Sequence, residues 1–207
     1  MKYRDYKLQG ENIFSHIYNR GNRKENIFLD DDDFSFFLLR LKQNLYPHIE
    51  KPQRMKCFPE NSFSLLCYIL IPNHFHFIIR QNGDIPVSKL MLKLTTSYSI
   101  HFNKKYEKVG HVFQGEFKQK PVENDSYLMW LSAYIHQNPR LHKITNDAES
   151  YKWSSYQEYL KPAVPDKICD TGLILGLFEN PPSYQKFVEE NYNILEQNKN
   201  IRKFCHD

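Results

Sequence analysis

The sequence predicts an α+β fold in which helices pack on an antiparallel β-sheet. Two kinds of hydrophobic pattern alternate along the chain: runs rich in β-branched and aromatic residues, which are typical of strands, and stripes at helical spacing. Their order is strand, helix, strand, strand, helix, strand, helix, which suits a ferredoxin-like sheet with a βαββαβ core. With 207 residues, 41% of them hydrophobic, the chain is long enough for one domain with its own core and an extension.

Four segments are expected to form the strands. The two central ones, 63–71 and the segment that starts near His74, flank Pro72-Asn73, a turn signal, and therefore predict a hairpin. The outer two are expected at residues 11–19 and in a segment that residues 111–118 lead into and that ends near Val122.

Three helices are expected between and after these strands. The first follows the acidic run Asp30–Asp33, which suits a helix N-terminus through capping and the macrodipole better than it suits a metal cluster. It runs to Leu45, and residues 48–61 form a loop. The second covers about 86–103, and the third covers 126–138 and is stopped by Pro139. Beyond residue 161, shorter helical patterns lie at 173–178 and 183–195.

The most informative stretch is His74-Phe75-His76. Residues two apart in a strand point to the same face, so the two imidazoles are expected side by side, with Phe75 and Phe77 on the opposite face. Two neutral imidazoles so placed can share one divalent metal ion. The alternative is a pair of polar residues on the solvated face of a half-buried strand. The pair alone leaves both interpretations open.

The third helix carries a partly polar stripe of Tyr127, Trp130, Tyr134 and Asn138. Tyr134 and Asn138 are four residues apart and share a face. An aromatic stripe usually packs in the core, but an asparagine at its end is unusual for core packing.

Basic residues are concentrated after the histidines. The formal net charge of the whole chain is +4, which alone does not imply nucleic acid. Between residues 80 and 120, however, there are eight basic residues and three acidic ones, so the local net charge is +5. This distribution fits a phosphate-binding surface, or in part a solvated helix face.

The four cysteines show no paired short spacing, so free thiols in a reducing, cytoplasmic setting are expected. No apolar N-terminal region or long apolar run indicates export or membrane insertion.

Five motifs follow one another over about residues 12–160. They are His16-Ile17-Tyr18-Asn19-Arg20-Gly21-Asn22, Pro72-Asn73-His74-Phe75-His76, Gly110-His111-Val112-Phe113-Gln114-Gly115, Tyr134-Ile135-His136-Gln137-Asn138-Pro139 and Trp153-Ser154-Ser155-Tyr156. Together they resemble the single-tyrosine HUH transposase family, in particular its REP-associated tyrosine transposase branch, which is similar to insertion-sequence single-strand transposases. One departure is Glu116, where many relatives carry a basic residue; it bears on the DNA contacts of that strand.

The resemblance implies an HUH endonuclease domain over residues 1–160, followed by a helical C-terminal extension over 161–207. It implies that Tyr134 attacks single-stranded DNA next to a hairpin and forms a 5′-phosphotyrosine link. It further implies that His74, His76 and Asn138 hold Mg²⁺ or Mn²⁺, and two imidazoles favour Mn²⁺ because Mg²⁺ prefers oxygen ligands. The partner is hairpin-containing single-stranded DNA, and the protein is a monomer or homodimer. The residues expected to contact DNA are Arg20, Arg23, Arg80, Lys104, Lys105 and Lys118.

Two alternatives remain open at this point. One is a nucleic-acid-binding protein of the same fold that does not cleave. The other is a metal-dependent phosphoesterase in which Tyr134 is structural. A covalent protein–DNA adduct separates the first hypothesis from both.

Overall fold

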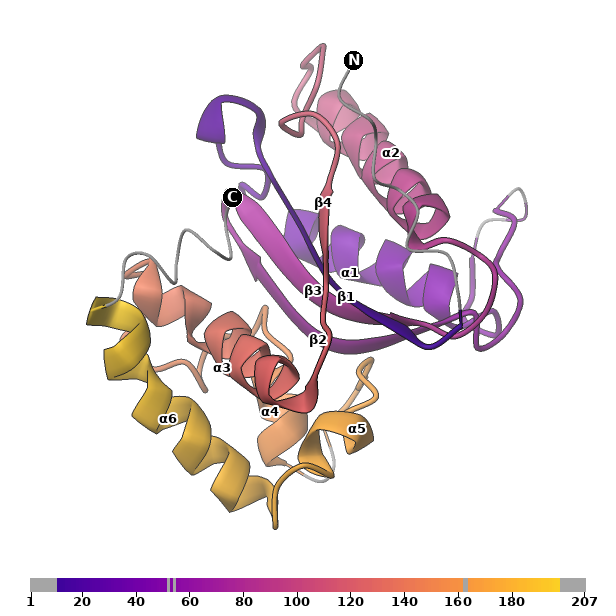
Figure 1. Cartoon of the computed structure of the whole chain (residues 1–207). Helices are drawn as coiled ribbons and strands as arrows, with labels where there is room; N and C mark the ends of the chain where they lie inside the picture. The colour runs from indigo at the N-terminus through magenta and orange to yellow at the C-terminus, as the bar shows by residue number, and fades with distance from the viewer. Residues whose placement is uncertain (1–10, 52, 54, 162–163, 198–207) are drawn as a thin grey trace, which may run out of the picture. The chain divides into compact units, whose positions relative to one another are not determined.

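The structure is a computed structural model that describes residues 11–51, 53, 55–161 and 164–197. In chain order, its elements are strands and helices up to α3 (Asp125–Leu141) and helices alone beyond it (Figure 1). Contacts divide the chain into two compact units. The first holds the described residues up to Leu65 and those from Leu70 to Val122. The second holds Leu66–Ile69 and the described residues from Glu123 onward.

The sheet has four strands in the order β2-β3-β1-β4. They are β1 (Ile13–Arg20), β2 (Phe63–Ile71), β3 (His74–Gln81) and β4 (Lys118–Pro121). Strand β1 pairs antiparallel with both β3 and β4. The order and the βαββαβ connection confirm the predicted α+β, ferredoxin-like fold.

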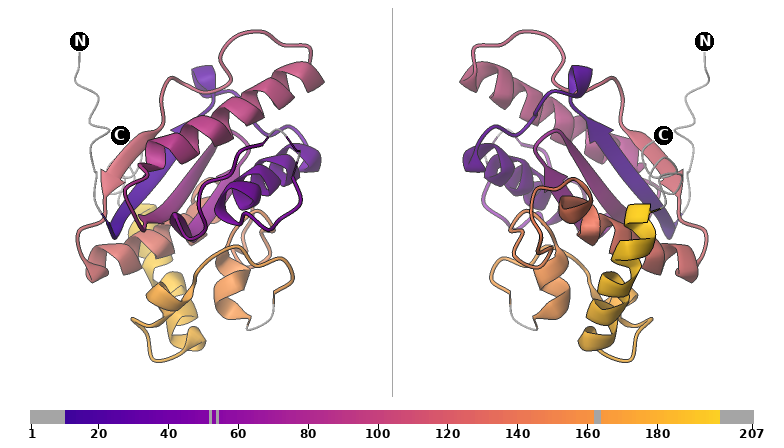
Figure 2. Two further views of the ribbon diagram at one scale, coloured as in Figure 1. Left: turned by 90° about the vertical axis from the view of Figure 1, so that its right-hand side faces the viewer. Right: turned by 90° about the vertical axis from the view of Figure 1, so that its left-hand side faces the viewer.

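Helices α1 (Asp31–Leu45) and α2 (Val87–Lys105) cover one face of the sheet (Figure 2). Their apolar stripes meet the odd-numbered residues of β3: Phe37 of α1 lies 5.3 Å from Phe75 and 6.2 Å from Phe77 between ring centroids. Asp30 caps α1 by accepting a hydrogen bond from the Asp33 amide at 3.1 Å, as the acidic run predicts.

The fourth strand is short and lies at the end of the segment predicted to lead into it. Only Lys118–Pro121 forms β4, which pairs with β1. The chain before β4 also stays bonded to the end of β1, because the Gln114 amide donates to the Arg20 carbonyl at 2.8 Å and Phe113 forms a bridge with Gly21. A turn follows at Gly115, whose φ is +67° and whose amide donates to the Phe113 carbonyl at 2.9 Å.

The second unit is built from helices: α3 (Asp125–Leu141), α4 (Tyr156–Leu160), α5 (Gly172–Leu175) and α6 (Pro181–Gln197). The helix predicted to stop before Pro139 in fact continues through it to Leu141. A proline in the last turn removes only one backbone donor, and the next turn closes with the His142 amide bonded to the Asn138 carbonyl at 3.0 Å. Helix α4 was not predicted. The predicted domain boundary near residue 160 stays a prediction.

No helix in the described part of the chain is both long and apolar enough to cross a membrane.

A buried polar network joins α3 to the centre of β2 within the second unit. His136 is fully buried, and its Nε2 lies 2.9 Å from Ser155 Oγ and 3.2 Å from Cys67 Sγ. Its Nδ1 lies 2.8 Å from the Tyr184 hydroxyl of α6. Because this site excludes water, burial lowers the pKa of His136 to about 3.

This pKa shift predicts acid sensitivity. An unfolded histidine titrates near ~6.5, so between that pH and about 3 the unfolded chain binds a proton that folded His136 refuses. The free energy of unfolding should therefore fall as the pH falls through this window, by up to about 1.4 kcal/mol per pH unit from this group. Urea denaturation at several pH values gives the slope of the unfolding free energy against pH. His136→Gln should lower this slope, whereas His48→Gln, at a loop position, should not. An unchanged slope in His136→Gln would contradict the assignment.

Candidate functional site

The candidate site begins on the face of the sheet opposite α1 and α2. Tyr18 pairs with His76 and Arg20 pairs with His74, and directly paired residues project to the same face. The even-numbered residues of β1 and β3 therefore share this face, which we call the histidine face. Its members on β1, β3 and β4 are Phe14, His16, Tyr18, Arg20, His74, His76, Ile78, Arg80, Lys118 and Lys120.

His74 and His76 lie side by side, as the strand alternation predicts. Their ring centroids are 5.1 Å apart and their planes are nearly perpendicular, at 85°. Both are more buried than a solvated strand face would make them, with 7% of His74 and 0% of His76 exposed. The interpretation of the pair as polar residues on a wet surface is therefore wrong.

The Nδ1 atoms of both rings are engaged by neighbouring polar atoms. His74 Nδ1 lies 2.7 Å from Asn73 Oδ1, and His76 Nδ1 lies 2.9 Å from His16 Nε2. A metal ion would therefore be bound through the Nε2 atoms, and imidazole ligands commonly hold their other nitrogen in such a hydrogen bond. The donor chemistry of these two residues fits a divalent ion.

Within residues 11–51, 53, 55–161 and 164–197, no three His, Cys, Asp or Glu side chains cluster so as to hold a metal ion.

Three of the six predicted DNA-contacting residues lie on the histidine face: Arg20, Arg80 and Lys118. Arg20 and Lys118 are exposed. The Lys118 ammonium lies 5.9 Å from the centre of the Tyr18 ring, and that of Lys120 lies 5.8 Å from it. The sequence prediction did not include Lys120, which pairs with His16. Strand register, had it been known, would have identified it.

The other three predicted residues lie elsewhere in the first unit. Arg23 is in the short helix η1 (Asn22–Lys24), and Lys104 and Lys105 end α2. Lys105 binds the carboxylates of Asp30 at 2.7 Å and of buried Asp33 at 3.0 Å. Its charge thus joins α2 to the start of α1, and these hydrogen bonds raise its pKa even though desolvation opposes the shift.

A hollow of about 470 Å³ lies on the other side of the same strands, and sequence reasoning missed it. It is bounded by α2 and by the loop before β4, with Lys89, Leu92, Phe113 and Phe117 in its walls. Its lining includes Asn19 and Gly115, which belong to two of the sequence motifs.

Tyr134 and Asn138 lie on α3, in the second unit, one helical turn apart. Both are buried, with exposed fractions of 1% and 0%. The rings of Trp130 and Tyr134 stack with centroids 6.0 Å apart, and Tyr127 continues the stack at 6.5 Å. The partly polar stripe predicted on this helix is thus present. His74 and His76, in contrast, belong to the first unit.

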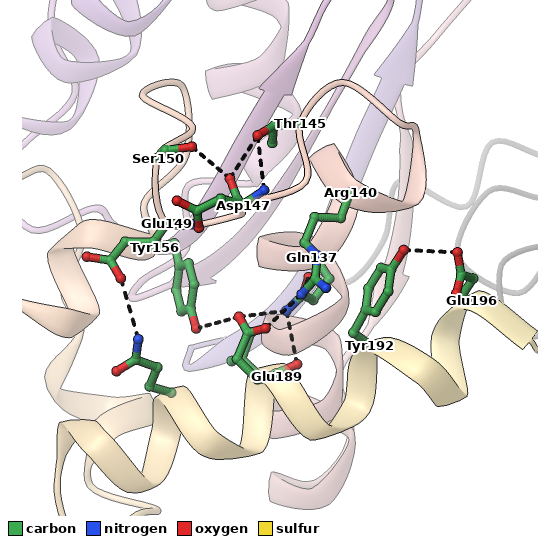
Figure 3. Close-up of polar contacts among 12 residues, drawn as sticks. Gln137, Arg140, Thr145, Asp147, Glu149, Ser150, Tyr156, Glu189, Tyr192 and Glu196 are labelled. Atoms are coloured by element: carbon green, nitrogen blue, oxygen red, sulfur yellow. Dashed lines mark hydrogen bonds and ion pairs between the residues drawn. The ribbon is translucent and has the colours of Figure 1, made fainter.

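Helix α6 fixes the end of α3 that carries Asn138 (Figure 3). Gln137 donates to the Val188 carbonyl and to Glu189, both at 3.1 Å. Arg140 forms an ion pair with Glu189 at 2.7 Å and lies 3.7 Å from the centre of the Tyr192 ring. These interactions join residues about 50 positions apart, so no local sequence pattern indicates them. The sequence therefore assigned α6 no role beyond packing or DNA contact.

Comparison with known proteins agrees with this geometry. A solved structure of a REP-associated tyrosine transposase bound to a REP hairpin has the same fold, with a TM-score of 0.56 at 16% identity, covering 83% of this chain and 93% of that one. No curated protein matches significantly. A family model described as "Transposase IS200 like" matches residues 41–138, which include both histidines, Tyr134 and Asn138. The match of residues 41–138 to this family model and the shared fold confirm the resemblance inferred from the motifs.

Proposed function

We propose that this protein is a metal-dependent single-stranded DNA endonuclease and strand transferase that acts next to DNA hairpins through a 5′-phosphotyrosine intermediate. The observation that carries the proposal is the buried pair of His74 and His76, held by their Nδ1 atoms on one face of β3. The matched family region, which also contains Tyr134, supports it. The hairpin-bound structural neighbour supports hairpin DNA as the partner.

In this proposal Tyr134 is the nucleophile. Its phenolic oxygen forms a bond to the scissile phosphorus as the bond to the 3′ oxygen breaks, so the 5′ phosphate stays on the protein and a 3′-OH is released. The phenolic proton leaves, and the departing 3′ oxygen gains one from solvent. The reverse attack by a 3′-OH rejoins strands without an external energy source. Tyr134 is well suited to this role because stacking on Trp130 fixes its ring.

His74, His76 and Asn138 would hold the divalent ion, with Nε2 atoms and an amide oxygen as donors. When bound, that ion supplies positive charge that polarises the scissile phosphate. Two imidazoles favour Mn²⁺ over Mg²⁺ as the ion that supports activity in vitro.

Single-stranded DNA would be held by the predicted basic residues, with aromatic rings for its bases. Arg20, Arg80 and Lys118 support this assignment best, because they share the histidine face. The transposase domain would cover residues 1–160 and the extension 161–207. We propose a monomer or a homodimer.

The nucleophile is tested by Tyr134→Phe, which removes one oxygen and keeps the ring stacked on Trp130. Adduct formation with a hairpin oligonucleotide and Mn²⁺ should vanish on a denaturing gel, while hairpin binding and stability persist. The matched control is Tyr127→Phe, two turns earlier in the same stack, which should leave adduct formation unchanged. Adduct mapped to any residue other than Tyr134 refutes the assignment, and no wild-type adduct with any metal favours the non-cleaving alternative.

The metal site is tested by His76→Ala. Cleavage should fall more than about 100-fold, because loss of a metal ligand costs more than loss of a residue that merely orients one. Chelation of the metal from the wild-type protein should have the same effect. His111→Ala, at an exposed position, is the control. Undiminished metal-dependent cleavage by His76→Ala would rule out the site.

DNA binding should depend on salt. For a single strand, each phosphate that a lysine neutralises adds about 0.7 to the slope of log affinity against log salt, so Lys118→Ala should reduce the slope by about that amount. Lys186→Ala, on the exposed side of α6, should not change it. Affinity that is flat between low and moderate salt, or equal binding of blunt duplex, would contradict this interpretation of the basic residues.

A further inference from the structure

His16 contacts the histidine pair, and neither the family match nor the predicted ligand set gives it a role. It lies on β1 opposite Ile78, so it is the diagonal neighbour of His76 on the histidine face. Its ring lies edge to edge with that of His76 and nearly in the same plane, with centroids 5.1 Å apart and planes at 17°. Tyr18 stacks on both rings, at 4.8 Å and 5.5 Å. The three rings form one layer, and within it the His16 ring faces His76.

The contact joins specific atoms: His16 Nε2 lies 2.9 Å from His76 Nδ1. One nitrogen must donate and the other must accept, and both residues are fully buried. Hydrogen bonds in such a dry setting fix the proton more firmly than they would in water.

The chemistry of metal binding decides which nitrogen carries the proton. A histidine that binds metal through Nε2 must keep its proton on Nδ1. His76 Nδ1–H can then donate only to an acceptor, so His16 must present an unprotonated Nε2 and carry its own proton on Nδ1.

His74 shows the same arrangement with a different partner. Its Nδ1 lies 2.7 Å from Asn73 Oδ1, an oxygen that can only accept. If both histidines bind the ion through Nε2, two chemically different acceptors, the His16 ring on β1 and the Asn73 amide in the turn before β3, select the same tautomer in the two neighbouring imidazoles.

We propose that His16 is a positioning residue: it accepts a hydrogen bond from His76 Nδ1–H and so holds His76 in the tautomer and orientation that bind a divalent ion through Nε2. This inference rests on the proposed metal site, and it adds a residue that acts through His76 and does not itself bind the ion.

The test uses the full chain, Mn²⁺ alone and no DNA, so that binding is measured apart from cleavage. His16→Phe keeps a ring that stacks on Tyr18 but removes the acceptor. His16→Gln loses the ring but places an amide oxygen near the former Nε2. Titration of free Mn²⁺ by electron paramagnetic resonance should give a dissociation constant about 10- to 100-fold weaker for His16→Phe. His16→Gln should recover most of that loss. His48→Phe, at a loop position, is the control.

A second readout follows the proton itself. Nitrogen NMR of the metal-free wild-type protein should place the proton of His76 on Nδ1, and His16→Phe should allow the other tautomer to appear. This measurement on the wild-type protein stands even where a variant fails to fold.

The outcomes separate the two levels of the proposal. A wild-type protein that binds no Mn²⁺ refutes the metal site, and the NMR measurement still tests His16. Wild-type binding that His16→Phe leaves unchanged overturns the role of His16, as does a wild-type His76 protonated on Nε2. Equal losses in His16→Phe and His16→Gln overturn the acceptor role. Pulsed electron paramagnetic resonance counts the nitrogen atoms that are coupled to bound Mn²⁺. One fewer coupled nitrogen in His16→Phe than in the wild type would mean that His16 is itself a ligand, which also overturns the proposed positioning role.

Discussion

The antiparallel pairing of β1 with β3 is the constraint on which the candidate site depends. The register places Tyr18 opposite His76 and Arg20 opposite His74. Because side chains alternate in a strand, a shift by one residue would turn the histidines toward α1 and bring Phe75 and Phe77 to the opposite face. The packing of those two rings on Phe37 opposes such a shift. The hydrophobic core thus sets the position of the polar site, and the same residues that bury β3 orient its histidines.

Local patterns were enough to predict the fold and the side-by-side histidines. Alternation in His74–Ile79 and helical stripes around Phe37 are encoded by neighbours in sequence, and the structure reproduces both. Prediction failed where the outcome depends on a backbone conformation or a distant partner. Pro139 was expected to stop the third helix, yet the backbone continues in helical form through it to Leu141. The contact of His16 with His76 spans 60 residues, so no local pattern could indicate it.

Helix α3 shows a different balance between sequence and structure. The spacing of Tyr134 and Asn138 predicts that they share a face of the helix. The contacts that hold the helix in place cannot be predicted from that spacing. Two residues of α3 between Tyr134 and Asn138 are held by groups far away in the sequence. His136 contacts Ser155 and Tyr184, and Gln137 contacts Glu189. A buried polar group without a partner is costly, so each of these contacts restricts the rotation of α3 about its axis. The helical tail is therefore part of what orients the proposed nucleophile, although it lies beyond the motifs that identified the family.

For the basic residues, too, position in the structure matters as much as their number in the sequence. The excess of basic residues between positions 80 and 120 suggested a phosphate-binding surface, but the structure shows that these charges are not equivalent. Lys105 lies between two carboxylates, and Lys93 lies 4.0 Å from the centre of the Phe58 ring. Lys118 and Lys120, in contrast, lie over Tyr18 on the histidine face. A cation above an aromatic ring that stacks on His76 can reach a phosphate near that histidine, while the ring itself offers a surface for a base. The position of a lysine in the strand register, more than the local net charge, therefore indicates which cations serve the proposed site.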